Sequence, residues 1–213
     1  MAQGGALIPP LKFIPLFERN GNIIRLDEYV FRAVCRQQKE WQKQGQKMLP
    51  VSVNISRVSL YYSSVVEKYE SIIRSFDLDS KYIQLEITES ATIDNNEIFN
   101  LLEQFHTAGF KILLDDFGSG YSSLAALNRM HFDTIKLDKS LVDYIGDDNG
   151  EKLLNSITKL AQSFGMENTA EGVETVEQLM FLCNLDCDDI QGYYFSRPLP
   201  VKEYEECLKE ACM

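Results

Sequence analysis

The stretch ILLDDFGSGYSS, residues 112–123, joins an apolar run to two adjacent aspartates and a loop rich in glycine and serine. An apolar run of this kind is typical of a strand that is buried on both faces. Asp115 and Asp116 leave this strand together, although neighbouring carboxylates repel each other and lose hydration there. A divalent cation would offset this cost, and the loop GSGYSS is expected to be flexible enough to turn sharply and adjust to a ligand. The stretch therefore predicts a strand that leads into a metal site.

Similar short segments recur along the chain and alternate with helical patterns. The expected strands are VSVNIS at 51–56, YIQLEIT at 82–88, KILLDDF at 111–117, TIKLD at 134–138, NTAEG at 168–172 and IQGYYF at 190–195. Two of the helices between them are expected to end at Gly109 and Gly165, because glycine favours the left-handed conformation at a helix end. The alternation predicts a parallel sheet covered by helices, either as a barrel or as an open doubly wound sheet.

The apolar residues between these strands recur at helical spacing. The expected buried faces are Val65, Tyr69, Ile72 and Phe76; Ile98, Leu102 and Phe105; and Leu153, Ile157, Leu160 and Phe164. Thr175 and Gln178 have the spacing of a capping box. Residues 1–25 differ, because LIPPLKFIPLFERNG contains three prolines and no clear period. They predict an N-terminal loop without a strand, followed by a helix that begins near Asp27.

Polar side chains lie near the end of each expected strand. They are Asn54, Glu86, Asp115 or Asp116, Lys136, Glu171 and Gln191. A barrel gives this pattern one explanation, because the active site of such a barrel lies at the carboxyl ends of its strands. Several carboxylates that meet there require cations, and carboxylate and amide oxygens suit Mg²⁺ or Mn²⁺. Two ions about 4 Å apart would suit in-line attack on phosphorus.

Composition limits the classes of partner. The chain has 213 residues, which fits a single domain over 1–213, and a formal net charge of −11. An acidic surface repels nucleic acid and anionic membranes, so neither a DNA or RNA polymer nor a membrane surface is an expected partner. No apolar run approaches the roughly 18 residues of a membrane span, and no signal peptide is evident. We expect a cytoplasmic segment, either free or part of a larger, membrane-anchored protein.

Cysteine and histidine give no sign of a metal site. The five cysteines are odd in number and lack CxxC spacing, which argues against disulfides and against a zinc site. The two histidines, His106 and His131, stand alone in the sequence. A histidine-based catalytic triad or a histidine-rich metal site is therefore not expected.

Six short motifs occur in a fixed order over nearly the whole chain. They are VNIS, LEITES, DDFGSGYSSL, IKLDKS, AEGVET and QGYYFSRPLP. In this order and spacing they resemble the EAL-domain family of bacterial cyclic di-GMP phosphodiesterases. The resemblance implies a modified TIM (β/α) barrel that hydrolyses cyclic di-GMP to linear pGpG with Mg²⁺ or Mn²⁺. It also implies a signalling protein in which this domain is fused to others.

The resemblance implies a role for each matching polar residue. The implied metal ligands are Asn54, Glu86, Asp115, Asp116 and Glu171, the last directly or through water. Lys136 would hold the attacking water and assist its deprotonation, and Gln191 would orient that water. Glu89 and Glu174 would be supporting carboxylates, with Glu89 anchoring the loop DDFGSG. Arg197 would bind substrate or brace the rim of the barrel.

The family takes its name from a Glu-Ala-Leu motif whose glutamate is a metal ligand, and this sequence does not contain that motif. Two of the usual eight strands are expected to be missing, which leaves an incomplete barrel of about six. We expect an N-terminal truncation rather than a natural shortening. Open strand edges predict self-association, as a homodimer. Loss of one anionic ligand predicts a weakened metal position and reduced or absent activity.

Other interpretations stay open at this point. The fold could serve as a catalytically inactive module that binds cyclic di-GMP or another protein. The residues alone would also allow a carbon-acid enzyme with Lys136 as its base. Asp115 and Asp116 could mark an ordinary turn, and Glu86 could form a buried ion pair with Lys136. The aromatic residues 193–195 are expected to pack, or to stack on guanine.

Overall fold

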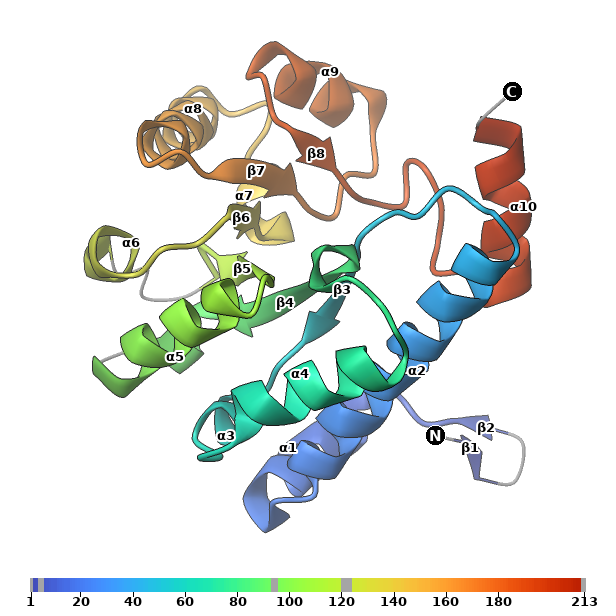
Figure 1. Ribbon diagram of the computed structural model, residues 1–213. Helices are drawn as coiled ribbons and strands as arrows, with labels where there is room; N and C mark the ends of the chain where they lie inside the picture. Colours follow the sequence, from blue (N-terminus) through green and yellow to red (C-terminus); the bar gives the residue numbers. More distant parts are fainter. Residues whose placement is uncertain (1, 4–5, 93–95, 120–123, 212–213) are drawn as a thin grey trace. The chain divides into compact units, whose positions relative to one another are not determined.

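The computed structural model describes residues 2–3, 6–92, 96–119 and 124–211 (Figure 1). The chain divides into two compact units, residues 1–134 and residues 135–213. Strands and helices alternate along both units, as the sequence predicts for an α/β protein. Among the helices of the described residues, none is both long enough and apolar enough to cross a membrane.

The N-terminal segment differs from the expected loop over 1–25. It contains β1 (Ala2–Gln3) paired with β2 (Ala6–Leu7), then α1 (Pro10–Asn20) and α2 (Ile23–Lys43). The expected loop, the expected lack of a strand and the helix start near Asp27 were wrong. Pro9 and Pro10 lie at the start of α1, where no backbone donor is needed. Pro15 removes one hydrogen bond inside α1, while Phe13 and Phe17 pack on each other one turn apart, with ring centroids 5.6 Å apart.

Three parallel strands form the sheet of the first unit. They are β3 (Val51–Asn54), β4 (Ile83–Thr88) and β5 (Lys111–Phe117), paired in chain order. The remaining elements of this unit are α3 (Arg57–Leu60), α4 (Val65–Ser75), η1 (Ser80–Tyr82), η2 (Glu89–Thr92), α5 (Asn96–Thr107) and α6 (Leu124–Arg129). The strands match the expected ones to within two residues at each end, so these predictions are confirmed.

The core of the first unit lies between helices and sheet, and α2 runs along α4 (Figure 1). The expected faces of α4 and α5 are buried, with Ile72 and Leu102 each 1% exposed; Phe76 follows α4 and is half-buried. Phe31 on α2 packs against Tyr69 on α4, with ring centroids 4.2 Å apart. Burial of these rings removes apolar area from water and adds aromatic edge contacts.

The second unit contains β6 (Thr134–Leu137, from the last residue of the first unit), β7 (Glu167–Ala170) and β8 (Asp189–Ile190). Its helices are α7 (Lys139–Val142), α8 (Asp148–Ser163), α9 (Val176–Asn184) and α10 (Val201–Ala211). Val142, Ala170, Val173 and Leu182 form a fully buried cluster. The capping box of Thr175 and Gln178 at the start of α9 is confirmed. Among the described residues, strands β3 to β8 are neighbours in the sheet in the same order as in the chain. This is the strand order expected for an incomplete α/β barrel.

The face of α8 differs from the expected one. Leu153 and Phe164 are 45% and 44% exposed, whereas Leu154 is fully buried. The cause lies at the start of the helix, where Gly150 packs so closely that a Cβ there would lie 2.7 Å from the Tyr144 carbonyl oxygen. This close approach turns the side of α8 that contains Gly150 and Leu154 inward.

The segment IQGYYF is not a six-residue strand. β8 ends at Ile190, and the chain turns over Tyr193, Tyr194 and Phe195. Gly192 causes the change of direction, because a Cβ at this position would lie 2.0 Å from the Val173 carbonyl oxygen. A backbone contact this close is possible for glycine alone, so the turn requires glycine at position 192.

Candidate functional site

Three oxygen-bearing side chains of the first unit share one face of its sheet. Asn54 lies opposite Glu86, and Asp115 lies opposite Thr88, two residues further along β4. Partners in neighbouring strands point to the same face, and so do residues i and i+2, so these side chains point to one side. Glu86 and Asp115 are each 8% exposed, while Asn54 is exposed. Each lies toward the carboxyl end of its strand.

Asp116 differs from its neighbour in both exposure and backbone. Its φ of 57° lies in the left-handed region, which Asp adopts more readily than most residues. The backbone N–H and Oγ of Ser119 donate to the Asp116 carbonyl at 3.1 and 2.8 Å, and these bonds fix the turn. Asp116 is exposed, whereas Asp115 is buried. The rest of the predicted flexible loop, residues 120–123, lies outside the described residues.

Glu89 follows β4 directly and begins the short helix η2. The residue is 6% exposed, and η2 contacts both β4 and β5. The Thr92 hydroxyl donates to the Glu89 carbonyl at 2.7 Å, which closes the helical turn. Glu89 thus lies beside the ends of the two strands that contain Glu86 and Asp115.

In the second unit, Lys136 and Glu171 form an ion pair. Lys136 Nζ, on β6, lies 2.7 Å from Glu171 Oε1, and the two side chains are 6% and 20% exposed. The Glu171 backbone N–H donates to the Leu137 carbonyl at 3.0 Å, which holds the first residue after β7 beside the end of β6. Removal of one partner of such a pair leaves a poorly hydrated charge.

Gln191 is held beside Glu171 by its backbone. Its N–H donates to the Ala170 carbonyl at 2.8 Å, and its carbonyl accepts from Val173 N–H at 3.1 Å. The Gln191 side chain is exposed. The ends of β6, β7 and β8 thus present Lys136, Glu171 and Gln191 in sequence.

Glu174 and Arg197 have other partners. Glu174 Oε1 lies 3.4 Å from Lys139 Nζ, and Lys139 also binds Asp143 at 2.9 Å. The hydrogen bond from Lys139 to Asp143 raises the pKa of Lys139, and the charge of Glu174 adds to this. The Arg197 guanidinium lies 4.5 Å from the centre of the Tyr193 ring, a cation–π contact.

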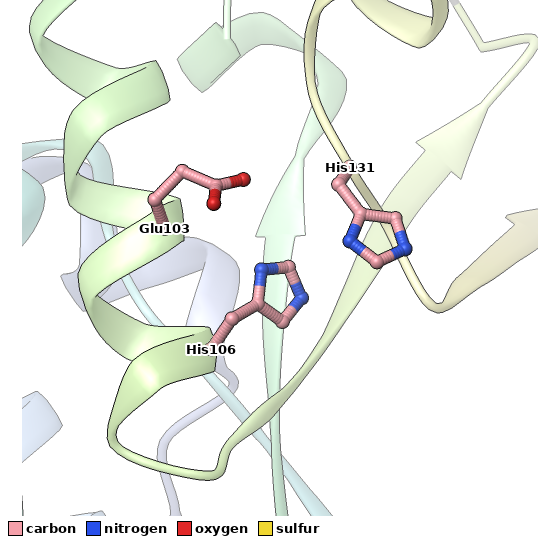
Figure 2. A group of neighbouring side chains, drawn as sticks. All are labelled: Glu103, His106 and His131. Carbon is pink, nitrogen blue, oxygen red and sulfur yellow. The ribbon is translucent and has the colours of Figure 1, made fainter.

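The two histidines, which stand alone in the sequence, lie close together in the structure. Figure 2 shows Glu103, His106 and His131 turned toward one another. The ligand atoms of these three side chains all lie within 4.8 Å of one another, and the histidine ring centroids are 4.8 Å apart. The spacing of Glu103 and His106 on α5 is visible in the sequence as an i, i+3 pair. The approach of His131 is a tertiary contact that sequence spacing does not show.

Comparison with known proteins agrees with the motifs. The EAL domain family matches residues 2–198, across both units, and the chain belongs to this family. The chain is 38% identical over 205 residues to the cyclic di-GMP phosphodiesterase NbdA of Pseudomonas aeruginosa, a match that covers 95% of this chain and 26% of NbdA. It is 35% identical to the cyclic di-GMP phosphodiesterase PdeR of Escherichia coli, over 95% of this chain and 31% of PdeR. The chain thus spans a minor part of both relatives.

Solved structures confirm the fold. The phosphodiesterase PaMucR, in complex with c-di-GMP, is 32% identical, with a TM-score of 0.88 over 96% of this chain and 83% of that one. BlrP1 of Klebsiella pneumoniae, in complex with calcium and cyclic di-GMP, is 26% identical, with a TM-score of 0.74 over 82% of this chain and 44% of that one. The prediction of an incomplete TIM-like α/β fold is confirmed.

Proposed function

We propose that this chain hydrolyses cyclic di-GMP to linear pGpG with the help of divalent metal ions, and that residues 1–213 act as one EAL-like phosphodiesterase domain. Family membership and the activity named for NbdA and PdeR support the reaction. The observation that carries the proposal is the register of β3, β4 and β5, which turns Asn54, Glu86 and Asp115 to one face near their carboxyl ends.

The oxygen donors of the chain fit Mg²⁺ or Mn²⁺. The proposed ligands are Asn54, Glu86, Asp115, Asp116 and Glu171. All of them offer carboxylate or amide oxygens, which hard cations prefer over nitrogen and sulfur ligands. Glu86 and Asp115 are largely removed from water, so a bound cation would offset the cost of burying these carboxylates. When bound, such ions polarise a phosphate and lower the pKa of a coordinated water.

Lys136 is proposed to hold the attacking water and to assist its deprotonation. Its ammonium group donates to the water oxygen and stabilises the developing negative charge, while Glu171, 2.7 Å away, keeps the ammonium in position. Gln191 orients the water through its side-chain amide. The water oxygen forms a bond to phosphorus as the bond from phosphorus to the 3′ oxygen breaks. The leaving oxygen takes up a proton that replaces the one released by the attacking water, and the product is pGpG with a free 3′ hydroxyl.

The remaining residues are proposed to support this reaction. Glu89 anchors the loop DDFGSG, which agrees with the contact between η2 and β5. Glu174 is a supporting carboxylate next to Lys139. Arg197 binds the substrate, because its guanidinium can pair with a phosphate or stack on a base. The exposed rings of residues 193–195 offer faces on which guanine can stack.

A second candidate function is suggested by the nucleotide complexes of solved relatives, such as that of PaMucR with c-di-GMP, because a complex of this kind demonstrates binding. In this case the chain binds cyclic di-GMP without hydrolysing it and acts through contacts with other proteins.

Incubation with cyclic di-GMP and Mn²⁺, followed by chromatography for pGpG, distinguishes the two candidates. We expect product from the wild type and a decrease of about 100-fold or more in Glu86→Gln, which removes one anionic donor. Glu70→Gln, a carboxylate on α4 paired with Arg74, is the matched control and keeps full activity. Binding of the nucleotide by calorimetry without any product favours the second candidate. If neither nucleotide binding nor product is observed, both candidate functions are contradicted.

We also propose a homodimer that works in the cytoplasm as one part of a longer signalling protein. In the described sheet order, β3 and β8 are the first and last strands, and unpaired strand edges favour association. NbdA and PdeR are several times longer than the matched region. Sedimentation equilibrium tests the dimer, and a single species with the monomer mass would contradict it.

A further inference from the structure

The group of Glu103, His106 and His131 lies entirely within the first unit. Glu103 and His106 project from α5, and His131 comes from the segment between α6 and β6 (Figure 2). Glu103 and His131 are exposed, and the His106 side chain is 17% exposed. The three residues therefore combine one fixed imidazole with two side chains that are accessible from solvent.

Asp133 fixes the orientation of His106. His106 Nε2 lies 3.0 Å from Asp133 Oδ2, which also accepts the Ile112 backbone N–H at 2.7 Å. Because Asp133 Oδ2 accepts the Ile112 N–H, the geometry favours His106 Nε2 as a second donor to this oxygen, which leaves Nδ1 directed away from Asp133.

His106 Nδ1 is the atom left for a ligand. It is buried and has no hydrogen-bond partner among the described residues. A buried acceptor without a partner is costly, and a metal ion removes that cost. Histidines that bind metals commonly have the same arrangement, with a carboxylate hydrogen-bonded to one ring nitrogen and the metal bound to the other. The carboxylate sets the tautomer and raises the basicity of the ligand.

We propose that Glu103, His106 and His131 bind one Zn²⁺ ion, with water in a fourth position. Two imidazoles and one carboxylate suit zinc, whereas magnesium prefers oxygen ligands alone. Tetrahedral zinc with bonds of about 2.1 Å requires ligand atoms roughly 3.4 Å apart. The ligand atoms lie up to 4.8 Å apart, so these distances must shorten when zinc binds. Rotation of the exposed side chains of Glu103 and His131 can bring the atoms closer.

This site is distinct from the proposed phosphodiesterase site. Asp133 binds Ile112 at the amino end of β5, whereas Asp115 lies three residues further toward the carboxyl end, roughly 10 Å along the strand. A metal ion here would tie the end of α5 to the segment before β6. Its effect is therefore on the stability of the first unit, with no part in hydrolysis.

The experiment uses the metal-free full chain, labelled with ¹⁵N. The sequence has two histidines, so the imidazole region of a long-range ¹H–¹⁵N spectrum contains two spin systems. Before zinc is added, His106 is expected as the Nε2–H tautomer. One equivalent of Zn²⁺ should shift Nδ1 of His106 and the signals of His131 together, and the same concentration of Mg²⁺ should shift neither. Zinc at 100 times its Kd should also raise Tm by about 5 °C or more.

Variants separate this site from other zinc-binding groups. His131→Ala and Glu103→Gln should each lower zinc affinity at least tenfold, measured on the His106 signals, and Asp133→Asn should lower it by about 10- to 100-fold. Gln104→Ala, an exposed neighbour on α5, should leave the affinity unchanged.

Three results would overturn the proposal. The first is that the NMR signals of His106 do not change in excess zinc. The second is that Gln104→Ala lowers zinc affinity as much as His131→Ala or Glu103→Gln. The third is a zinc-dependent doubling of mass in sedimentation, since that would mean an ion bridging two copies of the chain.

Discussion

At the scale of single residues, the ion pair between Lys136 and Glu171 is expected to contribute strongly to stability, because both side chains are largely removed from water. Lys136→Met keeps the length of the side chain and removes its charge, which leaves the Glu171 carboxylate poorly hydrated. We expect a loss of about 3 kcal/mol in the free energy of unfolding, measured in urea, together with loss of hydrolysis.

Two further variants test this reasoning. Lys136→Met with Glu171→Gln should recover part of the lost stability, because the stranded charge is gone. Lys139→Met removes an exposed pair with Asp143 and should cost about 0.5 kcal/mol or less. Equal losses in Lys136→Met and Lys139→Met would argue against a special role for the buried pair.

Asp133 predicts a pH dependence of stability. Its pKa in the folded protein lies below its ordinary value because the hydrogen bonds from His106 and the Ile112 backbone outweigh burial, and the titratable side chains that face it are His106 and His131. A lowered carboxylate pKa contributes stability that is complete above the unfolded pKa of about 3.9 and is lost as pH falls through the folded pKa. The stability difference between wild type and Asp133→Asn should therefore shrink as pH is lowered from 5 toward 3, as measured by urea unfolding. A difference that stays constant over this range would contradict the assignment.

The sequence predicted part of the site at this scale. Strand alternation was sufficient to select Asn54, Glu86 and Asp115, because the period of two fixes which side chains share a face. The pairing of His106 with His131 was missed, since 25 positions separate them and only the return of the chain through β5 and α6 brings them together. Local patterns contain no information on such contacts.

At the scale of secondary structure, substitutions of Asp116 at the end of β5 can separate the contribution of its backbone conformation to stability from the contribution of its carboxylate to hydrolysis. The left-handed φ of 57° suits Gly and Asn but strains a β-branched residue. Asp116→Val should lose about 1 to 2 kcal/mol of stability relative to Asp116→Gly, measured by thermal unfolding. All substitutions should reduce hydrolysis, because each removes the proposed ligand. Equal stability of the Val and Gly variants would mean that the turn is unstrained.

Helix α8 offers a direct test of which face is buried. Leu154→Ala should cost about 3 kcal/mol, because a fully buried leucine leaves a cavity. Leu153→Ala, at 45% exposure, is the matched control and should change stability by about 0.5 kcal/mol. A larger loss of stability in Leu153→Ala than in Leu154→Ala, measured by urea unfolding, would support the buried face predicted from the sequence.

The errors at this scale have identifiable causes. Strands β3 to β6 were predicted because the apolar residues within them are strong signals. The face of α8 was missed because the close contact of Gly150 with Tyr144, and not the number of leucines, sets which side turns inward. Helix α1 was missed because two of the three prolines in this segment, Pro9 and Pro10, lie at the helix start, where proline is tolerated.

At the scale of the whole molecule, removal of metal should separate activity from folding. A chelator should abolish pGpG formation, and Mg²⁺ or Mn²⁺ should restore it, because the proposed oxygen ligands require a hard cation. Far-ultraviolet circular dichroism should change little, because backbone hydrogen bonds hold the strands together. Hydrolysis that persists after complete removal of metal, verified by elemental analysis, would contradict metal dependence.

Gly192 limits how this chain can be redesigned. The Val173 carbonyl stands so close that the addition of even one methyl group would push the backbone away, and the adjacent residue is Gln191. A protein engineer who wishes to alter nucleotide preference by rebuilding the aromatic turn at 193–195 must therefore leave position 192 untouched. Any larger residue at position 192 would displace the backbone and, with it, the side-chain amide of the adjacent Gln191.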